Sequence, residues 1–98
     1  MSNYINYDEF LKISTEVELT ILCKEIDTIL IVNSFDMYDY DKDTCREKVV
    51  ELLKLTYKVS DIKQKAIAYN APNVVEACEA KINQIGEQME VLRNRYLY

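Results

Sequence analysis

The scarcity of glycine and proline most constrains the fold of this 98-residue chain, because Gly86 and Pro72 are the single representatives of their types. An all-β fold needs many tight turns, and glycine and proline supply much of the turn chemistry. The sequence therefore predicts an all-α fold made of a few long helices. At this length we expect a single domain, residues 1–98, built around one core.

Apolar periodicity divides the chain into three predicted helices, at about residues 7–33, 44–69 and 73–97. Short connections between long helices favour antiparallel neighbours, so the pattern predicts an up-down-up three-helix bundle. An alternative is an extended helical hairpin whose first helix is exchanged between protomers. Both arrangements are all-α, and either one allows assembly into a helical oligomer.

The starts of the second and third helices carry capping signals. Thr44, followed three residues later by Glu47, fits a capping box. Pro72 is hostile to a continuing helix, and Asn73 with Glu76 offers a fresh N-cap behind it. The sequence therefore predicts that the second helix begins at Thr44 and the third at Asn73.

The first predicted helix is apolar over most of its circumference. Its apolar residues fall on two stripes: Phe10, Ile13, Val17, Ile21 and Val32 on one, and Leu11, Leu19, Leu22, Ile26, Ile29 and Leu30 on the other. A helix with two apolar stripes needs more than one neighbour, and a three-helix monomer supplies only part of that. We therefore expect self-association or a partner helix.

The other two helices show one apolar side each. The broad apolar side of the second helix comprises Val49, Val50, Leu52, Leu53, Thr56, Tyr57, Val59, Ser60 and Ile67. The third helix carries Val75, Cys78, Ile82, Ile85, Met89, Leu92 and Tyr96, spaced alternately three and four residues apart. This heptad seam resembles that of a coiled coil and needs a partner helix to bury it, within the chain or between chains.

The charge, the apolar segments and the cysteines of the chain argue against several classes of function. The net charge of −5 argues against direct binding of nucleic acid. The start of the chain lacks the basic and apolar regions of a secretory signal, and the richest apolar window is too short and too charged to cross a bilayer. Three cysteines without any histidine predict reduced thiols, no metal site and no cofactor. We expect a soluble, cytoplasmic protein that does not bind membranes.

Catalysis finds little support in the sequence. Without histidine there is no imidazole base, and the cysteines lack the partner that would activate them. Asp39, Asp41 and Asp43 have the spacing that opens a calcium loop, but Thr44 stands where that loop needs glycine and Val50 where it needs glutamate. We therefore predict that the chain is not an enzyme and that these aspartates stabilise the start of the second helix.

Aromatic residues concentrate at the expected ends of the bundle. An up-down-up topology brings the connection after the first helix to the same end as the C-terminus, where tyrosine and arginine could serve an interface. The candidate binding residues are Phe35, Tyr38, Tyr40, Arg93, Arg95, Tyr96 and Tyr98 at this end, and Tyr4, Tyr7 and Tyr69 at the other.

Two functional hypotheses follow. The first is a non-enzymatic, self-associating protein-interaction module that binds and modulates or inhibits a partner protein through its aromatic ends. The bias toward Ile, Asn, Lys, Asp and Tyr indicates an AT-rich genome, such as that of a phage or another virus, which fits an inhibitor of a host factor. The alternative is an oligomer that holds an anionic, nucleotide-like small molecule between protomers.

Overall fold

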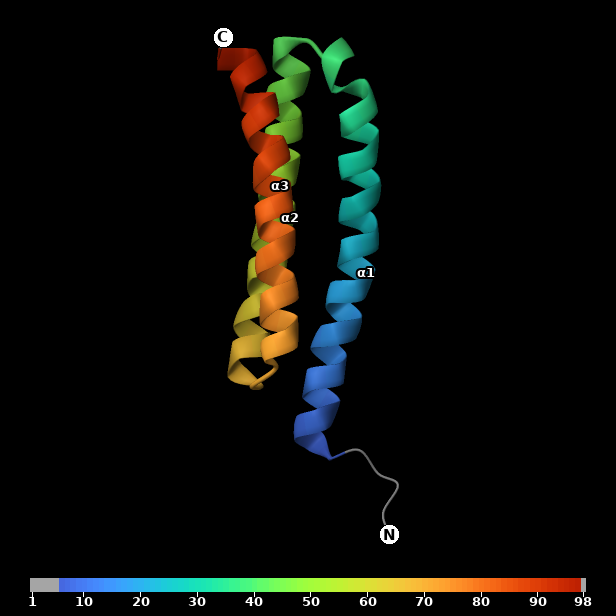
Figure 1. The fold of residues 1–98 in the computed structure, drawn as a ribbon, viewed down its shortest axis with the longest axis vertical. Helices are drawn as coiled ribbons and strands as arrows, with labels where there is room; N and C mark the ends of the chain where they lie inside the picture. Colours follow the sequence, from blue (N-terminus) through green and yellow to red (C-terminus); the bar gives the residue numbers. More distant parts are fainter. Residues whose placement is uncertain (1–5, 98) are drawn as a thin grey trace.

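The computed structural model describes residues 6–97, which form an all-α, up-down-up bundle of three helices (Figure 1). The helices are α1 (Tyr7–Asp36), α2 (Lys42–Ala68) and α3 (Pro72–Leu97). A short 3-10 helix (Met37–Asp39) follows α1 and turns the chain toward α2. The predicted fold class is confirmed, and the C-terminal end of α3 lies beside the connection between α1 and α2 (Figure 1).

The capping prediction for α2 is wrong. The helix begins at Lys42 rather than Thr44, and Asp41 is its N-cap, with a carboxylate oxygen that accepts a 2.7 Å hydrogen bond from the backbone N–H of Thr44. Aspartate is a stronger N-cap than threonine, so it replaces the predicted box of Thr44 and Glu47. The end of α1 was also placed too early, because that helix continues past residue 33 to Asp36.

The connection between α2 and α3 is a tight helix stop. Asn70 adopts a left-handed conformation (φ 57°), and the N–H of Ala71 bonds to the carbonyl of Ala66 at 2.8 Å. This is a Schellman arrangement with asparagine in the place of glycine. Pro72 is the first residue of α3, where its missing N–H costs nothing, so the predicted start at Asn73 is wrong by one residue.

The tightest packing in the molecule joins α2 and α3, which contact each other along most of their lengths. The seam of α3 lies in this interface: Cys78, Ile85 and Leu92 are buried, and Val75, Ile82, Met89 and Tyr96 pack around them. The seam is therefore intramolecular core. The side of α2 that faces it differs from the prediction, since Leu55, Ile62 and Ala66 are buried whereas Val50, Leu53, Tyr57 and Ile67 are exposed.

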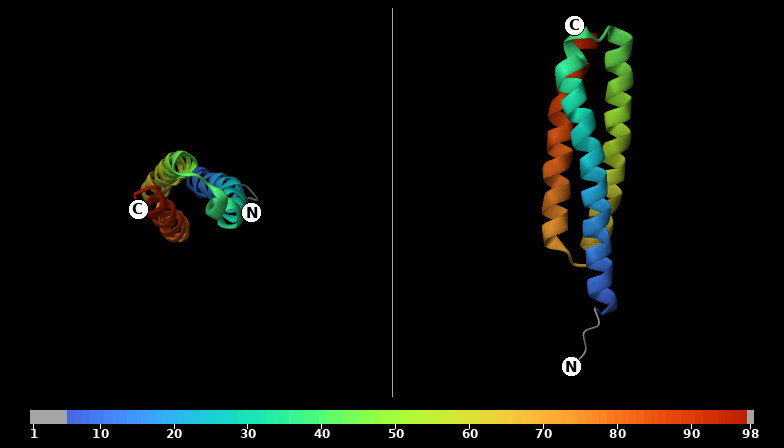
Figure 2. Two further views of the ribbon diagram at one scale, coloured as in Figure 1. Left: turned by 90° about the horizontal axis from the view of Figure 1, so that it is seen from above. Right: turned by 90° about the vertical axis from the view of Figure 1, so that its right-hand side faces the viewer.

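The two apolar stripes of α1 lie on different faces of the helix. Its inner stripe packs against the α2–α3 hairpin and contributes Leu19, Leu22, Ile26 and Leu30 to the core. Its outer stripe faces away, and Phe10, Ile13, Val17, Ile21 and Val32 are all exposed. Figure 2 shows α1 at one edge of the hairpin, with its far side uncovered. Among residues 6–97, no helix combines the length and apolar character of a membrane span.

Candidate functional site

A partly buried polar bridge holds α1 against α3 near the C-terminal end of α1. Asn33 donates a hydrogen bond from Nδ2 to Oε1 of Gln88 at 3.0 Å and accepts one from the hydroxyl of Tyr40 at 3.0 Å. Gln88 in turn donates to the carbonyl oxygen of Leu30 at 2.8 Å. These hydrogen bonds replace the ones that the polar atoms lose to water when the helices pack. The network ties α1, α3 and the connection into one unit.

The same end carries an arginine that organises the connection. The guanidinium of Arg95 donates a 3.0 Å hydrogen bond to the carbonyl oxygen of Tyr38 and lies 5.4 Å from the centre of its ring. Two further cations stand over tyrosines: Arg46 lies 5.3 Å from the ring of Tyr96, and Lys48 lies 5.8 Å from the ring of Tyr40. These cation–π contacts fix the tyrosines in place from the helix ends.

The structure separates the predicted aromatic residues of this end into two groups. Tyr40 and Tyr96 are half-buried and pack on the core, whereas Phe35 and Tyr38 are 78% and 73% exposed. Arg95 is half-buried, and Arg93 is exposed on α3. At the opposite end, Tyr7 is exposed at the start of α1 and Tyr69 is half-buried at the end of α2. Two candidates, Tyr98 of the first end and Tyr4 of the opposite end, lie outside the described residues.

The chain segment that contains Tyr38 is rich in aspartate. Asp36 and Asp39 are exposed on either side of Tyr38, while Asp41 caps α2 and Asp43 pairs with Arg46 at 3.2 Å. The hydrogen bond from the backbone N–H of Thr44 lowers the pKa of Asp41 below its ordinary value. Within residues 6–97, no three side chains of the metal-binding types gather into a site for an ion. The local chemistry is that of two exposed aromatic rings, Phe35 and Tyr38, in a segment rich in aspartate, with Arg95 beside the ring of Tyr38.

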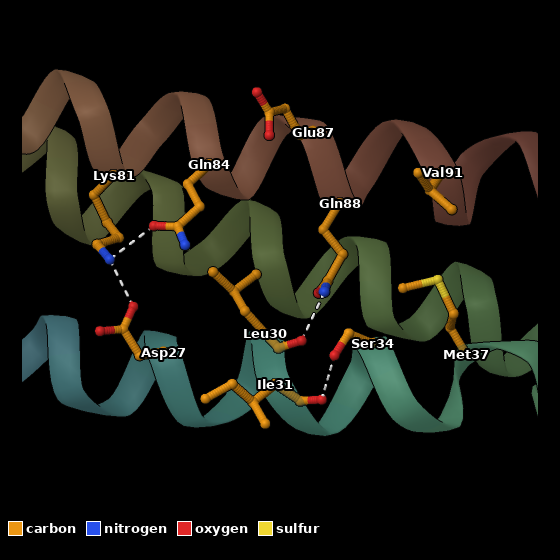
Figure 3. Close-up of a pocket in the computed structure, with 10 residues that line it drawn as sticks. All are labelled: Asp27, Leu30, Ile31, Ser34, Met37, Lys81, Gln84, Glu87, Gln88 and Val91. Atoms are coloured by element: carbon orange, nitrogen blue, oxygen red, sulfur yellow. Dashed lines mark hydrogen bonds and ion pairs between the residues drawn. The ribbon is translucent and has the colours of Figure 1, made fainter.

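A groove of about 610 Å³ runs between α1 and α3 (Figure 3). Lys81 crosses its edge, with hydrogen bonds to Asp27 at 2.6 Å and to Gln84 at 2.8 Å. The lining residues are Asp27, Leu30, Ile31, Ser34, Met37, Lys81, Gln84, Glu87, Gln88 and Val91. The groove therefore presents two carboxylates, those of Asp27 and Glu87, and one ammonium, that of Lys81, which is already paired with Asp27.

Sequence reasoning missed Asn33 and Gln88, which are separated by most of the chain. One signal was present: Asn33 continues the inward spacing of Ile26 and Leu30, where an amide must find a buried partner. Burial also raises the pKa of two thiols, Cys23 on α1 and Cys78 on α3, each chiefly because the thiolate would lose hydration. Raised pKa values make both thiols poor nucleophiles near neutral pH.

Comparison with protein-family models, with curated proteins and with solved structures found no match, so the function of this chain is argued from its own geometry.

Proposed function

We propose that this protein is a non-enzymatic interaction module that binds a partner protein through the acidic end around Tyr38. The observation that carries the proposal is the state of Tyr38, whose side chain is 73% exposed while Arg95 bonds to its carbonyl oxygen and makes a cation–π contact with its ring. A rigid aromatic side chain loses little conformational freedom on binding, which is the property of an interface anchor.

The charges around Tyr38 support a partner with a basic contact surface. Asp36 and Asp39 flank the ring and are exposed, and neither forms an ion pair with another described residue. Acidic groups at the rim of an interface accelerate association with a basic partner and exclude acidic competitors. By occupying such a surface, the module would modulate or inhibit the partner without chemistry of its own.

The proposal is tested by quantitative capture of proteins from native host extract. Tyr38→Ser is compared with the wild type and with Tyr57→Ser, a matched control that removes another exposed tyrosine from the middle of α2. The wild type and the control should retain the same partner, and Tyr38→Ser should lose most of it. Asp36→Asn/Asp39→Asn should weaken retention and reduce its dependence on salt. Equal retention by Tyr38→Ser and Tyr57→Ser would contradict the proposal.

A further inference from the structure

The outer face of α1 carries more exposed apolar surface than any other face described for residues 6–97. Seven large side chains lie on it: Phe10, Ile13, Val17, Ile21, Ile31, Val32 and Phe35. Ile31 and Phe35 thus extend the outer stripe of α1 from five residues to these seven. Phe10 and Phe35, at its two ends, are 59% and 78% exposed. The hairpin covers the opposite side of the helix and cannot reach this stripe (Figure 2).

The two ends of the outer stripe are related symmetrically about its middle. Phe10 and Phe35 lie equally far from the midpoint between Leu22 and Cys23, and so do Ile13 and Val32. The same operation exchanges Val17 with Thr28 and Ile21 with Lys24, and all four of these side chains are exposed. A surface on which apolar residues repeat under a two-fold rotation is self-complementary, which is the requirement for a closed dimer.

We infer that the outer stripe of α1 binds the same stripe of a second copy of this chain, with the two α1 helices antiparallel. Each Phe10 then lies level with Phe35 of the other copy, and each Ile13 lies level with Val32. Ile21 and Lys24 lie next to the two-fold axis, and Val17 and Thr28 lie farther out. This inference deepens the proposed function, on which it rests for its biological meaning, by identifying how the module assembles.

The apolar area available is that of a stable homodimer. Taking about 200 Å² for a whole phenylalanine side chain and about 100 Å² for an aliphatic one, the exposed fractions of the seven residues amount to roughly 500 Å². An interface of standard size buries about 800 Å² per partner, and about two thirds of a homodimer interface is apolar. Complete burial of the seven side chains would therefore supply about the apolar area of an interface of standard size.

The antiparallel pairing can accommodate the lysine near the middle of the stripe. Lys24 and Glu16 are both exposed, and neither forms an ion pair within residues 6–97. In the antiparallel pairing Lys24 lies level with Ile21 of the second copy, about one and a half helical turns from its Glu16 and on the same side of the interface. The lysine ammonium can therefore leave the apolar seam toward an acidic side chain.

The shape of the molecule gives the dimer a further contact. The start of α1 extends beyond the turn that joins α2 and α3 (Figure 1), and Phe10, in the first turns of α1, is 59% exposed. Antiparallel pairing places Phe35 of the second copy against this overhanging end. It also carries the two acidic ends around Tyr38 to opposite extremities of the assembly, which makes the dimer bivalent for a partner.

The oligomeric state is tested by sedimentation equilibrium at micromolar concentration. The wild type should have the mass of a dimer, and Ile13→Glu/Ile21→Glu should be monomeric because two carboxylates would be buried in the seam. The matched control is Val50→Glu/Tyr57→Glu, which changes two exposed apolar residues of α2 and should remain dimeric. A monomeric wild type, or a stripe variant that stays dimeric with an unchanged helical signal, would overturn the inference.

The direction of pairing is tested by disulfide cross-linking in a Cys23→Ala background. An equal mixture of a Val17→Cys chain and a Thr28→Cys chain should form a mixed disulfide under mild oxidation, because these two positions are level and both point toward the centre of the seam. Neither chain alone should cross-link, because two copies of position 17 would be about 16 Å apart along the paired helices, far beyond the reach of a disulfide. Efficient self-linkage of Val17→Cys, or no mixed product, would overturn the antiparallel pairing.

The two proposals fail separately. Tyr38→Ser leaves the outer stripe intact and should remain a dimer even though it loses the partner. Ile13→Glu/Ile21→Glu keeps the acidic end and should still bind the partner, with the avidity of one site instead of two. Loss of dimer mass with partner binding intact would thus implicate the stripe alone.

Discussion

Asn33 on α1 and Gln88 on α3 are joined by a 3.0 Å hydrogen bond in a part of the interface where Asn33 is only 1% exposed. The apolar contacts around this pair would tolerate a shift of α1 along the hairpin, because contacts between leucine and isoleucine side chains depend little on direction. The amide pair does not tolerate it, because a shifted helix leaves buried donors and acceptors unpaired. The bridge therefore sets the register of α1 on the hairpin, a role known for single buried polar residues in coiled coils.

Removing one side of the bridge should cost more than removing both. Asn33→Ala leaves Gln88 and the hydroxyl of Tyr40 without their partner, so we expect a loss of about 2 kcal/mol in the free energy of unfolding. Asn33→Leu/Gln88→Leu replaces the amides by apolar groups and should lose less, while relaxing the register. Urea denaturation of the single and double variants measures both effects. A double variant less stable than Asn33→Ala would argue against the bridge as the register device.

The two tyrosines of the connection should respond differently to the same substitution. Tyr38→Ser removes an exposed ring and should change the free energy of unfolding by less than about 0.5 kcal/mol. Tyr40→Ser should cost about 2 kcal/mol, because Tyr40 packs on the core and its hydroxyl bonds to Asn33. Tyr40→Phe isolates the hydroxyl, worth about 1 kcal/mol. Thermal or urea unfolding provides the comparison, and equal losses at both positions would show that the exposed ring is structural.

Stability should decline at alkaline pH through two cysteines. Burial raises the pKa of Cys23 and Cys78 in the folded state, whereas in the unfolded chain they titrate at about pH 8.5. Above that pH the unfolded chain binds fewer protons than the folded one, so the free energy of unfolding falls as pH rises. In the presence of a reductant, the stability advantage of the wild type over Cys23→Ala/Cys78→Ala should therefore shrink between pH 7 and pH 10. An advantage that is constant or grows over this range would refute the prediction.

Helix α1 should open more readily than the hairpin. It contacts α2 and α3 at far fewer positions than those helices contact each other, and its inner face includes the buried polar residues Thr15 and Asn33. Fewer packed contacts lower the free energy of local opening. Native-state hydrogen exchange should show smaller protection factors for the central amides of α1 than for those of α2 and α3. Dilution below the dimer dissociation constant should widen this gap, and uniform protection across all three helices would contradict the prediction.

The number and direction of the helices, the α3 seam and the two stripes of α1 could be read from the sequence. Periodicity in one chain segment reports which residues share a face, and with few turn residues a long helix has little competition. It does not report where a neighbouring helix lies. The apolar side predicted for α2 therefore included Val50 and Tyr57, which are exposed, and omitted Leu55 and Ile62, which are buried. Apolar residues surround much of α2, and contact with two neighbours selects the buried set.

Prediction from the sequence is limited in the same way for the individual residues of the caps and of the candidate site. Asp41 and Thr44 are both competent N-caps, and the choice between them depends on where α1 and its 3-10 extension end. Tyr38 and Tyr40 are two residues apart in one connection, yet one is exposed and the other reaches Asn33. By itself the sequence determined an all-α chain with one more apolar helix face than its own core can use. Only the tertiary structure decided which face that is, because burial depends on the position of helices distant in sequence and not on the local pattern.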